Sequence, residues 1–382
     1  MIRSLARHVG RFVLAVVLLV VLLCTVEVVM RVRRVRQRLQ DETVSTDAEL
    51  IRPSRTTFLE PVPLLDTVGG DAESVTIVTS EWGTRGKSPV LPKPVNTFRI
   101  LCLGGEETFA RTLPEEETFC AQLATFLQQQ TGRPVEVINA GCPTSSPLSQ
   151  TLRLRQRLLQ LQPDLVVFNL QSREVSFDPI VRGSLHLDED GHAAYAANPI
   201  YTASTNPLLA SLKEEFATVD WVLGKTQNTL QDLSRKATPL SEEELGLSID
   251  VLQEAQQLTN AQRAHCFVSL VPDTWETVPP AGVSAEQRAT PLSIYSSLTA
   301  ANGQQRIVFL DTVSNFRHHT QPRELFTANG KLSPAGHRLY AATLGQAILQ
   351  QVSAGSNRPV PQYSEAPPVV RESEMVRRPT GP

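Results

Sequence analysis

The sequence predicts an α/β protein in which a parallel sheet of about five strands is covered by helices on both faces, behind one N-terminal membrane helix. Three observations lead to this fold class. The 382 residues are enough to bury a full core. From residue 97 onward, short strand-like runs alternate with helical patterns, and strands that are separated by helices imply right-handed crossovers and parallel pairing. One long apolar run stands near the N-terminus.

Composition narrows the class of protein further. The chain is 41% hydrophobic and 20% charged with a net charge of -3, and it shows no basic stripe with interleaved aromatic residues, so nucleic acid is not an expected partner. Its five cysteines form no CxxC motif and no metal-ligand spacing. Cys102 and Cys266 lie in apolar strand-like runs and are expected to be buried free thiols. No cofactor is implied.

Residues 12–30 form the apolar run, which follows a basic N-terminus at residues 1–11. At about 1.5 Å per residue, a helix of this length just spans a bilayer core. A cleaved signal peptide is the competing interpretation, but no small-x-small cleavage site follows the run, so an uncleaved anchor is favoured. Five arginines between Arg31 and Arg38 follow the span, and by charge alone they would keep the C-terminal side in the cytoplasm.

The rest of the chain divides into three parts. Residues 31–95 are expected to form a juxtamembrane stalk and a pre-domain segment, residues 96–353 the main domain, and residues 354–382 a disordered, proline-rich tail. An insertion at residues 175–235 is expected to carry its own helix around residues 208–230. The predicted strands are 97–103, 135–139, 164–170, 266–271 and 307–311, and the predicted helices are 115–131, 148–162, 242–259, 292–302 and 334–352.

The first predicted strand of the main domain runs directly into a Gly104-Gly105 turn and then into a helical segment. A tight strand-to-helix turn of this kind presents one side chain at the top of a parallel sheet, as in the nucleophile elbow of hydrolases. Here that side chain is Glu106, where a serine would be expected for ester hydrolysis.

Five segments in the right order resemble the SGNH/GDSL hydrolase superfamily, in particular its membrane-anchored bacterial members, over about residues 80–352. They are Glu81-Trp-Gly-Thr-Arg-Gly86, Arg99-Ile-Leu-Cys-Leu-Gly104, Val137-Ile-Asn-Ala-Gly-Cys-Pro-Thr144, Leu161-Gln-Pro-Asp-Leu-Val-Val167 and Lys331-Leu-Ser-Pro-Ala-Gly-His-Arg-Leu-Tyr-Ala341. The resemblance implies the three-layer, flavodoxin-like α/β/α fold of that superfamily.

The resemblance also implies four catalytic blocks, and this chain departs from each of them. Glu106 stands at the position of the nucleophilic serine, Thr144 at that of an oxyanion-hole glycine, and Arg173 at that of an oxyanion-hole asparagine. Ala328 and Lys331 stand at the positions of the aspartate and the histidine that complete the triad. Because the parts of a triad act as a unit, loss of the family's ester hydrolysis is expected, with no catalytic residues retained.

If the fold is kept, Glu106, Arg173 and Lys331 converge at the carboxyl edge of the sheet. They form either an ion pair that fills an inherited pocket or a site for a charged ligand or peptide. The ion pair is favoured, and it predicts that Glu106 lies within salt-bridge range of Lys331 or Arg173. Glu106 and Glu107 together suggest a metal or glycosidase pair, but capping and dipole compensation at the start of the helix is the favoured interpretation.

The remaining polar residues are expected to be structural, and no metal site is expected. His337 is interpreted as a packing residue, and the His318-His319 pair as solvated, with a metal site as the alternative. Residues 188–191 are expected to form an acidic surface turn. Arg153, Arg155 and Arg157 are expected to be solvated, with Arg153 and Arg157 on one helix face.

These observations favour a membrane-tethered, non-catalytic binding or scaffold protein at the cell envelope, with glycans or envelope proteins as partners. The envelope role and the extracytoplasmic, periplasmic side come from the resemblance alone. The alternative is an active esterase, O-acyltransferase or deacetylase on envelope glycans or lipids that uses a rearranged site around Thr108, Thr144 or Ser145. A third hypothesis is an interaction protein that faces the cytoplasm, as the arginines after the span suggest.

Overall fold

The computed structural model describes residues 14–31, 50–69, 75–201, 240–274 and 285–354, together with residues 11, 216, 218–219 and 222. Most of the predicted basic N-terminus, the arginines after Arg31, nearly all of the predicted helix at 208–230 and the predicted tail from residue 355 lie outside the described residues.

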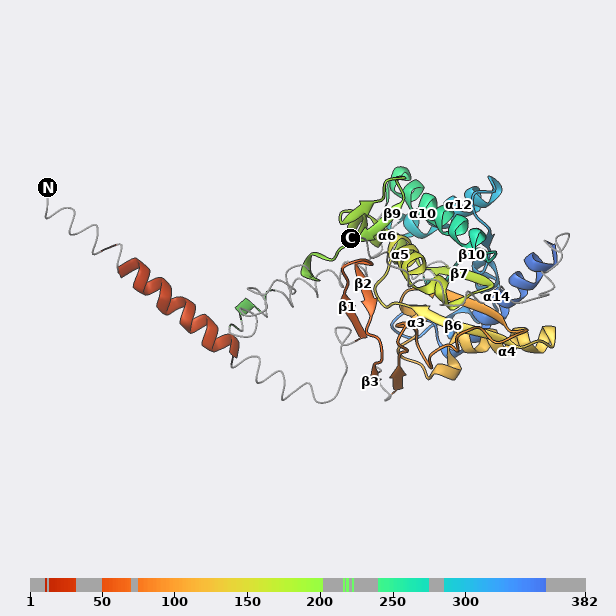
Figure 1. The fold of residues 1–382 in the computed structure, drawn as a ribbon, viewed down its shortest axis with the longest axis horizontal. Coiled ribbons are helices and arrows are strands. Elements are labelled where there is room, and N and C mark those ends of the chain that lie inside the picture. Colours follow the sequence, from red (N-terminus) through yellow and green to blue (C-terminus); the bar gives the residue numbers. More distant parts are fainter. Residues whose placement is uncertain are drawn as a thin grey trace, which may run out of the picture.

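The centre of the molecule is a sheet of five parallel strands, as the sequence predicts (Figure 1). The strands are β5 (Phe98–Gly104), β6 (Val135–Gly141), β7 (Leu165–Leu170), β10 (His265–Leu270) and β11 (Phe309–Leu310). Their spatial order is β11-β10-β7-β5-β6. This is the flavodoxin-like order, in which the direction of winding reverses between β5 and β7, and open α/β sheets bind ligands at the carboxyl ends of the strands at that point.

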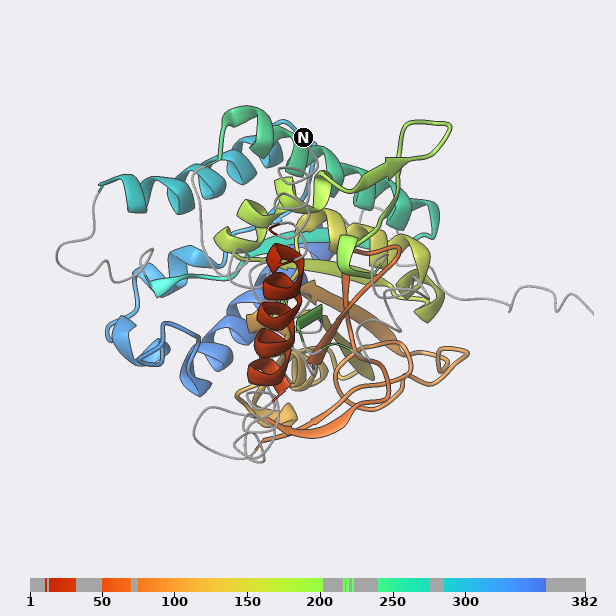
Figure 2. The same ribbon diagram turned by 90° about the vertical axis from the view of Figure 1, so that its left-hand side faces the viewer.

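Helices cover both faces of the sheet (Figures 1 and 2). One face carries α4 (Phe119–Thr131) and α14 (Pro334–Ala354), which pack on Ile100 and Cys102 of β5. The other face carries α5 (Pro147–Gln156), α6 (Ser172–Arg182), α10 (Glu242–Ala261) and α12 (Ala285–Gly303), which pack on Leu101 and Leu103. Alternate side chains of β5 therefore pack into two separate hydrophobic clusters, one on each face of the sheet, as expected for a strand that is covered on both faces.

Local signals fix where these helices begin and end. Ser241 begins α10 with a capping box that it shares with Glu244, and Ser146 begins α5 with a similar box closed by Ser149. Gly132 ends α4 in the left-handed conformation at φ 63°, which glycine adopts without strain.

Shorter elements complete the described chain. Three antiparallel hairpins pair β1 with β2, β3 with β4 and β8 with β9. The remaining elements are β1 (Ile51–Pro53), β2 (Leu59–Pro61), β3 (Asp66–Gly69), β4 (Val75–Val78), β8 (Leu185–Leu187), β9 (Ala193–Ala196), α3 (Glu106–Phe109), α13 (Val313–Arg317), and the 3-10 helices η1 (Glu115–Glu117), η2 (Leu158–Leu161) and η3 (Pro322–Leu325).

The segment before the sheet is tied to it by Arg85. The backbone of Arg85 forms a bridge with Asn139 on the outer edge of β6. Its buried guanidinium donates hydrogen bonds to the carbonyl oxygens of Phe109, the last residue of α3, and of Ala110 and Leu113 beyond it. Arg85 thus satisfies carbonyls that α3, a helix of one turn, cannot satisfy itself.

The N-terminal apolar helix spans Leu14–Arg31, with a mean hydropathy of 2.5 over 18 residues, none of them buried. Its bounds are close to the predicted 12–30. A helix of this length and composition is consistent with a signal anchor or a signal peptide.

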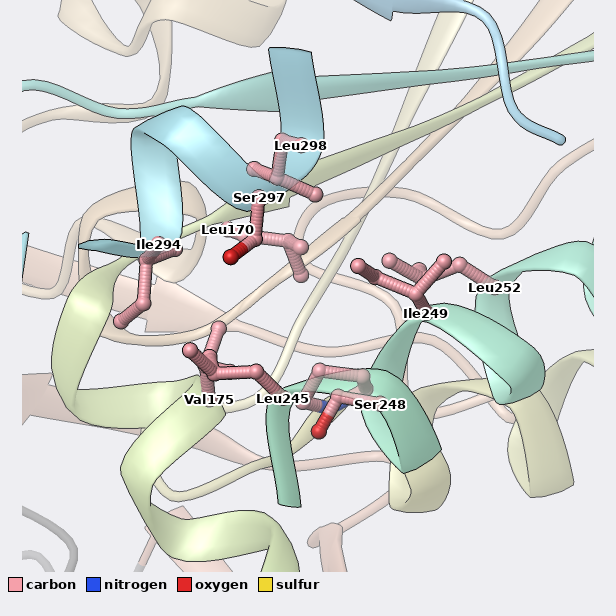
Figure 3. A pocket seen from close by; sticks show the side chains of 10 residues that line it. Leu170, Val175, Leu245, Ser248, Ile249, Leu252, Ile294, Ser297 and Leu298 are labelled. Carbon is pink, nitrogen blue, oxygen red and sulfur yellow. The ribbon is translucent and has the colours of Figure 1, made fainter. Parts of the chain in front are cut away.

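One small apolar cavity lies between the helices of the second face, with Ile294 and Leu298 of α12 on one side and Leu245 and Ile249 of α10 on the other (Figure 3). It holds only about 10 Å³, and its lining is almost wholly aliphatic. A site this small and apolar stays dry and is a packing gap.

Candidate functional site

The turn between β5 and α3 lies at the point where the winding reverses, and its two glycines are required by close packing. A Cβ atom on Gly104 would lie 2.6 Å from the carbonyl oxygen of Asn169 on β7 and would collide with the Thr108 side chain. A Cβ atom on Gly105 would lie 2.6 Å from the carboxyl carbon of Glu174. The turn is therefore pressed against both α3 and α6, and only glycine fits.

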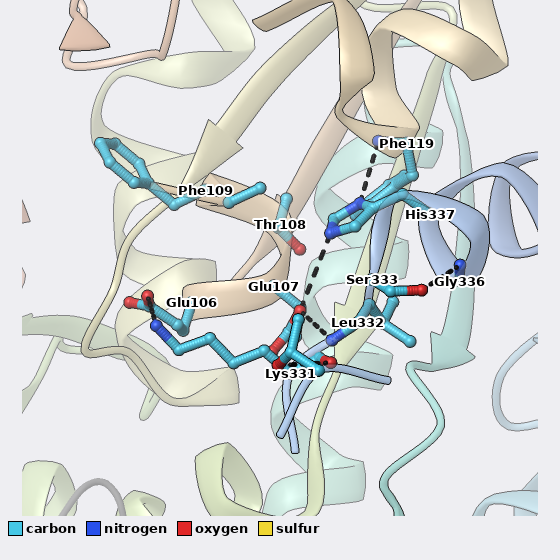
Figure 4. Close-up of polar contacts among 12 residues, drawn as sticks. Glu106, Glu107, Thr108, Phe109, Phe119, Lys331, Leu332, Ser333, Gly336 and His337 are labelled. Carbon is cyan, nitrogen blue, oxygen red and sulfur yellow. Dashed lines mark hydrogen bonds and ion pairs between the residues drawn. The ribbon is translucent and has the colours of Figure 1, made fainter. Parts of the chain in front are cut away.

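Glu106, which the turn presents, is held by two cations. Its Oε1 lies 3.1 Å from Nζ of Lys331 (Figure 4). The same oxygen lies 2.9 Å from Nε of Arg111. The predicted ion pair with Lys331 is confirmed, whereas Arg111 was missed because it lies outside the family motifs. The Glu106 side chain is only 13% exposed, so its charge is largely withdrawn from water and needs these partners.

Glu107 turns the other way, into the protein. Its Oε2 accepts a hydrogen bond of 3.1 Å from the backbone N–H of Leu332, and its Oε1 lies 3.7 Å from Nη2 of Arg173. Burial raises the pKa of Glu107 to about 7, although the positive charge of Arg173 opposes the shift. The expected capping bond from Glu107 is absent, because the segment that folds over α3 offers its carboxylate a donor of its own. Both glutamates do lie in the first turn of α3, where acidic side chains oppose the helix dipole.

His337, the first-turn histidine of α14, lies behind Glu107. Its Nδ1 accepts a hydrogen bond of 3.1 Å from the backbone N–H of Phe119, and its ring stacks on Phe119 with centroids 5.9 Å apart (Figure 4). Its Nε2 lies 3.8 Å from Oε2 of Glu107. Burial lowers the pKa of His337 to about 3, so the ring is neutral with its proton on Nε2. The packing role is as predicted; the contact with Glu107 was not foreseen.

A second buried carboxyl group lies across the turn on α6. Oε2 of Glu174 accepts a hydrogen bond of 3.1 Å from Nε2 of Gln150, which also donates to Oγ of Ser145 at 3.0 Å. Burial raises the pKa of Glu174 to about 8, against the opposing charge of Arg173. Arg173 does not join Glu106 by an ion pair in this arrangement; its ion-pair partner is Glu107.

The other family positions lie in two loops at the same edge. Thr144 is buried in the turn that follows β6. Ala328 is exposed, in a loop that a bridge between Phe326 and Leu332 closes. The structure thus joins Glu106 with Lys331 directly, and Arg173 to the same cluster through Glu107, while Ala328 leaves the aspartate position without a side-chain acid.

Two of the hydroxyl groups considered for a rearranged site lack the setting of a nucleophile. Oγ1 of Thr108 is buried and has no hydrogen-bond partner within the described part of the chain. Oγ of Ser145 accepts a hydrogen bond from Gln150, and the Ser145 side chain is buried. A hydroxyl group becomes nucleophilic through a base that removes its proton, and an amide donor cannot do so.

The remaining sequence predictions have mixed outcomes. Cys102 and Cys266 are buried free thiols, as expected. The acidic turn joins β8 to β9, where Asp188 accepts hydrogen bonds from the N–H groups of Asp190 and His192. His318 is exposed, and its Nδ1 lies 2.8 Å from the carbonyl oxygen of Ser314.

The prediction of solvated arginines is wrong for Arg153 and Arg155, whereas Arg157, at the end of α5, is partly exposed. Arg153 is 5% exposed and donates to the carbonyl oxygen of Ala140. Arg155 forms ion pairs with Asp188 and Glu254. These arginines are covered because the β1–β2 and β8–β9 hairpins fold over the helix, which its own sequence cannot reveal.

The strand order and the elbow define the class of this protein, an α/β protein with a flavodoxin-like parallel sheet and a glutamate at the tip of the turn after its first strand. No family model matches the chain, and no curated protein matches it.

Solved structures similar to this chain are SGNH/GDSL-type lipases and esterases at low identity. They include a GDSL-like lipase from Bacteroides thetaiotaomicron (13% identity, 66% of this chain and 89% of that one, TM-score 0.35). Another is a lipase/acylhydrolase from Enterococcus faecalis (12% identity, 66% of this chain and 96% of that one, TM-score 0.37). A third is a catalytic mutant of an acetylxylan esterase from Geobacillus stearothermophilus (14% identity, 66% of this chain and 93% of that one, TM-score 0.39). Likeness of this degree says nothing about activity or substrate.

Proposed function

We propose that this protein is a membrane-anchored, SGNH-like protein that lacks ester hydrolysis and acts as a binding or scaffold partner at the cell envelope. The observation that carries the proposal is the ion-paired Glu106. At the one position where the elbow would present a nucleophile, a carboxylate lies between Lys331 and Arg111. Opposite charges on both sides make this carboxylate a weak nucleophile, since attack would have to break both ion pairs.

The surroundings of the elbow support a binding role over catalysis. Nδ1 of His337 accepts a hydrogen bond from the backbone N–H of Phe119, and its Nε2 faces the carboxyl group of Glu107. Neither ring nitrogen is therefore placed to remove a proton from a hydroxyl group. Glu107 and Glu174 are deeply buried, beneath the partly exposed side chains of Glu106, Arg173 and Lys331. A ligand at this edge would meet the carboxylate of Glu106 and three cations, Arg111, Arg173 and Lys331, which suits an anionic or zwitterionic group.

The membrane anchor is the apolar helix Leu14–Arg31, which we propose remains uncleaved with the α/β domain on the extracytoplasmic side. Eighteen residues at 1.5 Å rise give about 27 Å, close to the hydrocarbon thickness of a bilayer. The side of the membrane rests on the sequence resemblance alone.

The test is hydrolysis of p-nitrophenyl acetate by the full-length protein in detergent micelles. We expect no turnover above that of micelles alone. A matched series compares Thr108→Ala and Ser145→Ala with Thr125→Ala, which removes an exposed hydroxyl group in the middle of α4. Turnover that disappears in Thr108→Ala or Ser145→Ala and persists in Thr125→Ala would overturn the proposal in favour of a rearranged active site.

A further inference from the structure

A second pocket lies away from the elbow, between the β1–β2 hairpin, the turn at residues 80–86 and the end of α5. It encloses about 200 Å³. Its lining shares no residue with the cluster around Glu106, and seven of the nine lining residues carry polar or charged side-chain groups. They are Thr56, Thr57, Glu60, Pro61, Trp82, Arg153, Gln156, Arg157 and Leu158.

Arg153 is the unusual member of this lining. It is 5% exposed, and its Nη1 donates a hydrogen bond of 2.9 Å to the carbonyl oxygen of Ala140. Its Nη2 is buried and has no hydrogen-bond partner among the described residues, and no carboxylate in that part of the chain lies within ion-pair distance. An unpaired buried charge costs several kcal/mol, so native proteins almost always give such a group a partner.

The other lining groups are also rich in donors. Nε1 of Trp82 is buried without a partner in the described structure. The guanidinium of Arg157 lies 5.6 Å from the centre of the Trp82 ring, which adds a second cation at the pocket. The one carboxylate of the lining, Glu60, is already engaged, since its Oε1 lies 2.7 Å from Nη2 of Arg52. The pocket therefore has more hydrogen-bond donors and more positive charge than its own acceptors satisfy.

We propose that this pocket binds a small hydroxylated carboxylate of about the size of one sugar ring. The carboxylate would be held by the positive charges of Arg153 and Arg157, which both line the pocket, since Arg153 has no carboxylate partner among the described residues. Hydroxyl groups of the ligand would meet the side chains of Thr56, Thr57 and Gln156. The volume corresponds to roughly six or seven water molecules at about 30 Å³ each, which admits one small molecule and excludes a polymer.

The experiment is isothermal titration calorimetry of the full-length protein in detergent, with D-glucuronate, D-glucose and inorganic phosphate as probes. We expect D-glucuronate to bind, and D-glucose and phosphate to bind at least tenfold more weakly. Glucose removes the carboxylate and keeps the hydroxyl groups, whereas phosphate keeps an anion and removes the carbon frame. Absent glucuronate binding, or equal affinity for either comparison probe, would overturn the proposal.

Two substitutions on α5 provide a matched pair. Arg157→Gln removes the second cation of the pocket and is expected to weaken glucuronate binding about tenfold or more. Arg155→Gln removes the same charge two residues away, where the side chain forms ion pairs with Asp188 and Glu254 outside the pocket, and is expected to change the affinity less than twofold. Equal effects of the two substitutions would contradict the site. Arg153→Gln should abolish binding; if that variant does not fold, the comparison of Arg157→Gln with Arg155→Gln decides. The proposal does not depend on the inactivity of the elbow.

Discussion

Glu107 gives the sharpest prediction for the elbow, because its burial makes the stability of the whole domain depend on pH. The unfolded chain releases this proton near the ordinary glutamate pKa of 4.5, whereas the folded protein holds it until the pKa of about 7 that burial imposes. The folded state therefore binds more protons than the unfolded state between these values, and the free energy of unfolding falls as pH rises through that window. The contribution of Glu107 is complete below pH 4.5 and is lost above pH 7.

The size of the effect follows from the two pKa values. Moving the pKa from 4.5 to about 7 corresponds to about 3 kcal/mol, at 1.36 kcal/mol for each tenfold change in the proton equilibrium. Glu107→Gln keeps an oxygen that can accept from the N–H of Leu332 and cannot ionise. Relative to the parent, this variant should gain about 3 kcal/mol in unfolding free energy between about pH 4 and about pH 8. Glu174, which also titrates in this range, is present in both proteins and cancels in the difference.

The assay is urea unfolding of the full-length protein in detergent, followed by tryptophan fluorescence at a series of pH values. Glu116→Gln is the control, since Glu116 is exposed on η1 and forms no hydrogen bond or ion pair with this cluster within the described part of the chain. We expect the Glu116→Gln curve to run parallel to the parent and the Glu107→Gln curve to diverge upward with pH. A Glu107→Gln difference that is constant with pH would refute the reasoning, because Glu107 would then not hold a proton in the folded state.

Three further predictions concern the ion pair, the anchor of the elbow and the membrane. Glu106→Gln and Lys331→Met should each destabilise the protein, and together by about 1 kcal/mol less than the sum, because they share one ion pair; additive effects in a double-mutant cycle would speak against it. Arg85→Lys should lower the unfolding free energy by about 2 kcal/mol or more, since an ammonium group cannot reach three carbonyls at once; a loss below about 0.5 kcal/mol in urea unfolding would contradict this. A topology reporter fused after Arg38 should give the extracytoplasmic signal, and a cytoplasmic signal would remove the basis of the envelope role.

The strands of the sheet were predictable because each is an apolar run between turn signals. The observed bounds of β5 and β7 lie within one residue of the predicted bounds at each end. The edge strand β11 is shorter than predicted, since it pairs with β10 only through Phe309 and Leu310. The predicted helix at 115–131 is divided at Thr118, whose ψ of 150° interrupts the helical path and caps α4. Such breaks depend on a single capping residue inside a helical pattern, and periodicity does not detect them.

The candidate site was predictable only where a motif fixed the register. Glu106 and Lys331 each lie in one of the segments that resemble the catalytic blocks, so the fold implied by that resemblance predicted their ion pair. The burial of Glu107 and its contact with His337 depend on how the Leu332 segment folds back over α3, which neither local sequence contains. The same holds for Arg153, whose environment is made by a hairpin almost a hundred residues earlier.

The contacts of Arg85 bear on how this protein can be produced. A fragment that starts at residue 96, where the sheet begins, would lose the bridge that covers the outer edge of β6 and the guanidinium that satisfies the carbonyls at and after the end of α3. An exposed strand edge promotes association between copies. The segment from residue 50 also supplies Leu50, Ile51 and Phe58 to buried clusters. A soluble fragment for crystallisation should therefore start between the N-terminal apolar helix and residue 50, and shorter versions should aggregate.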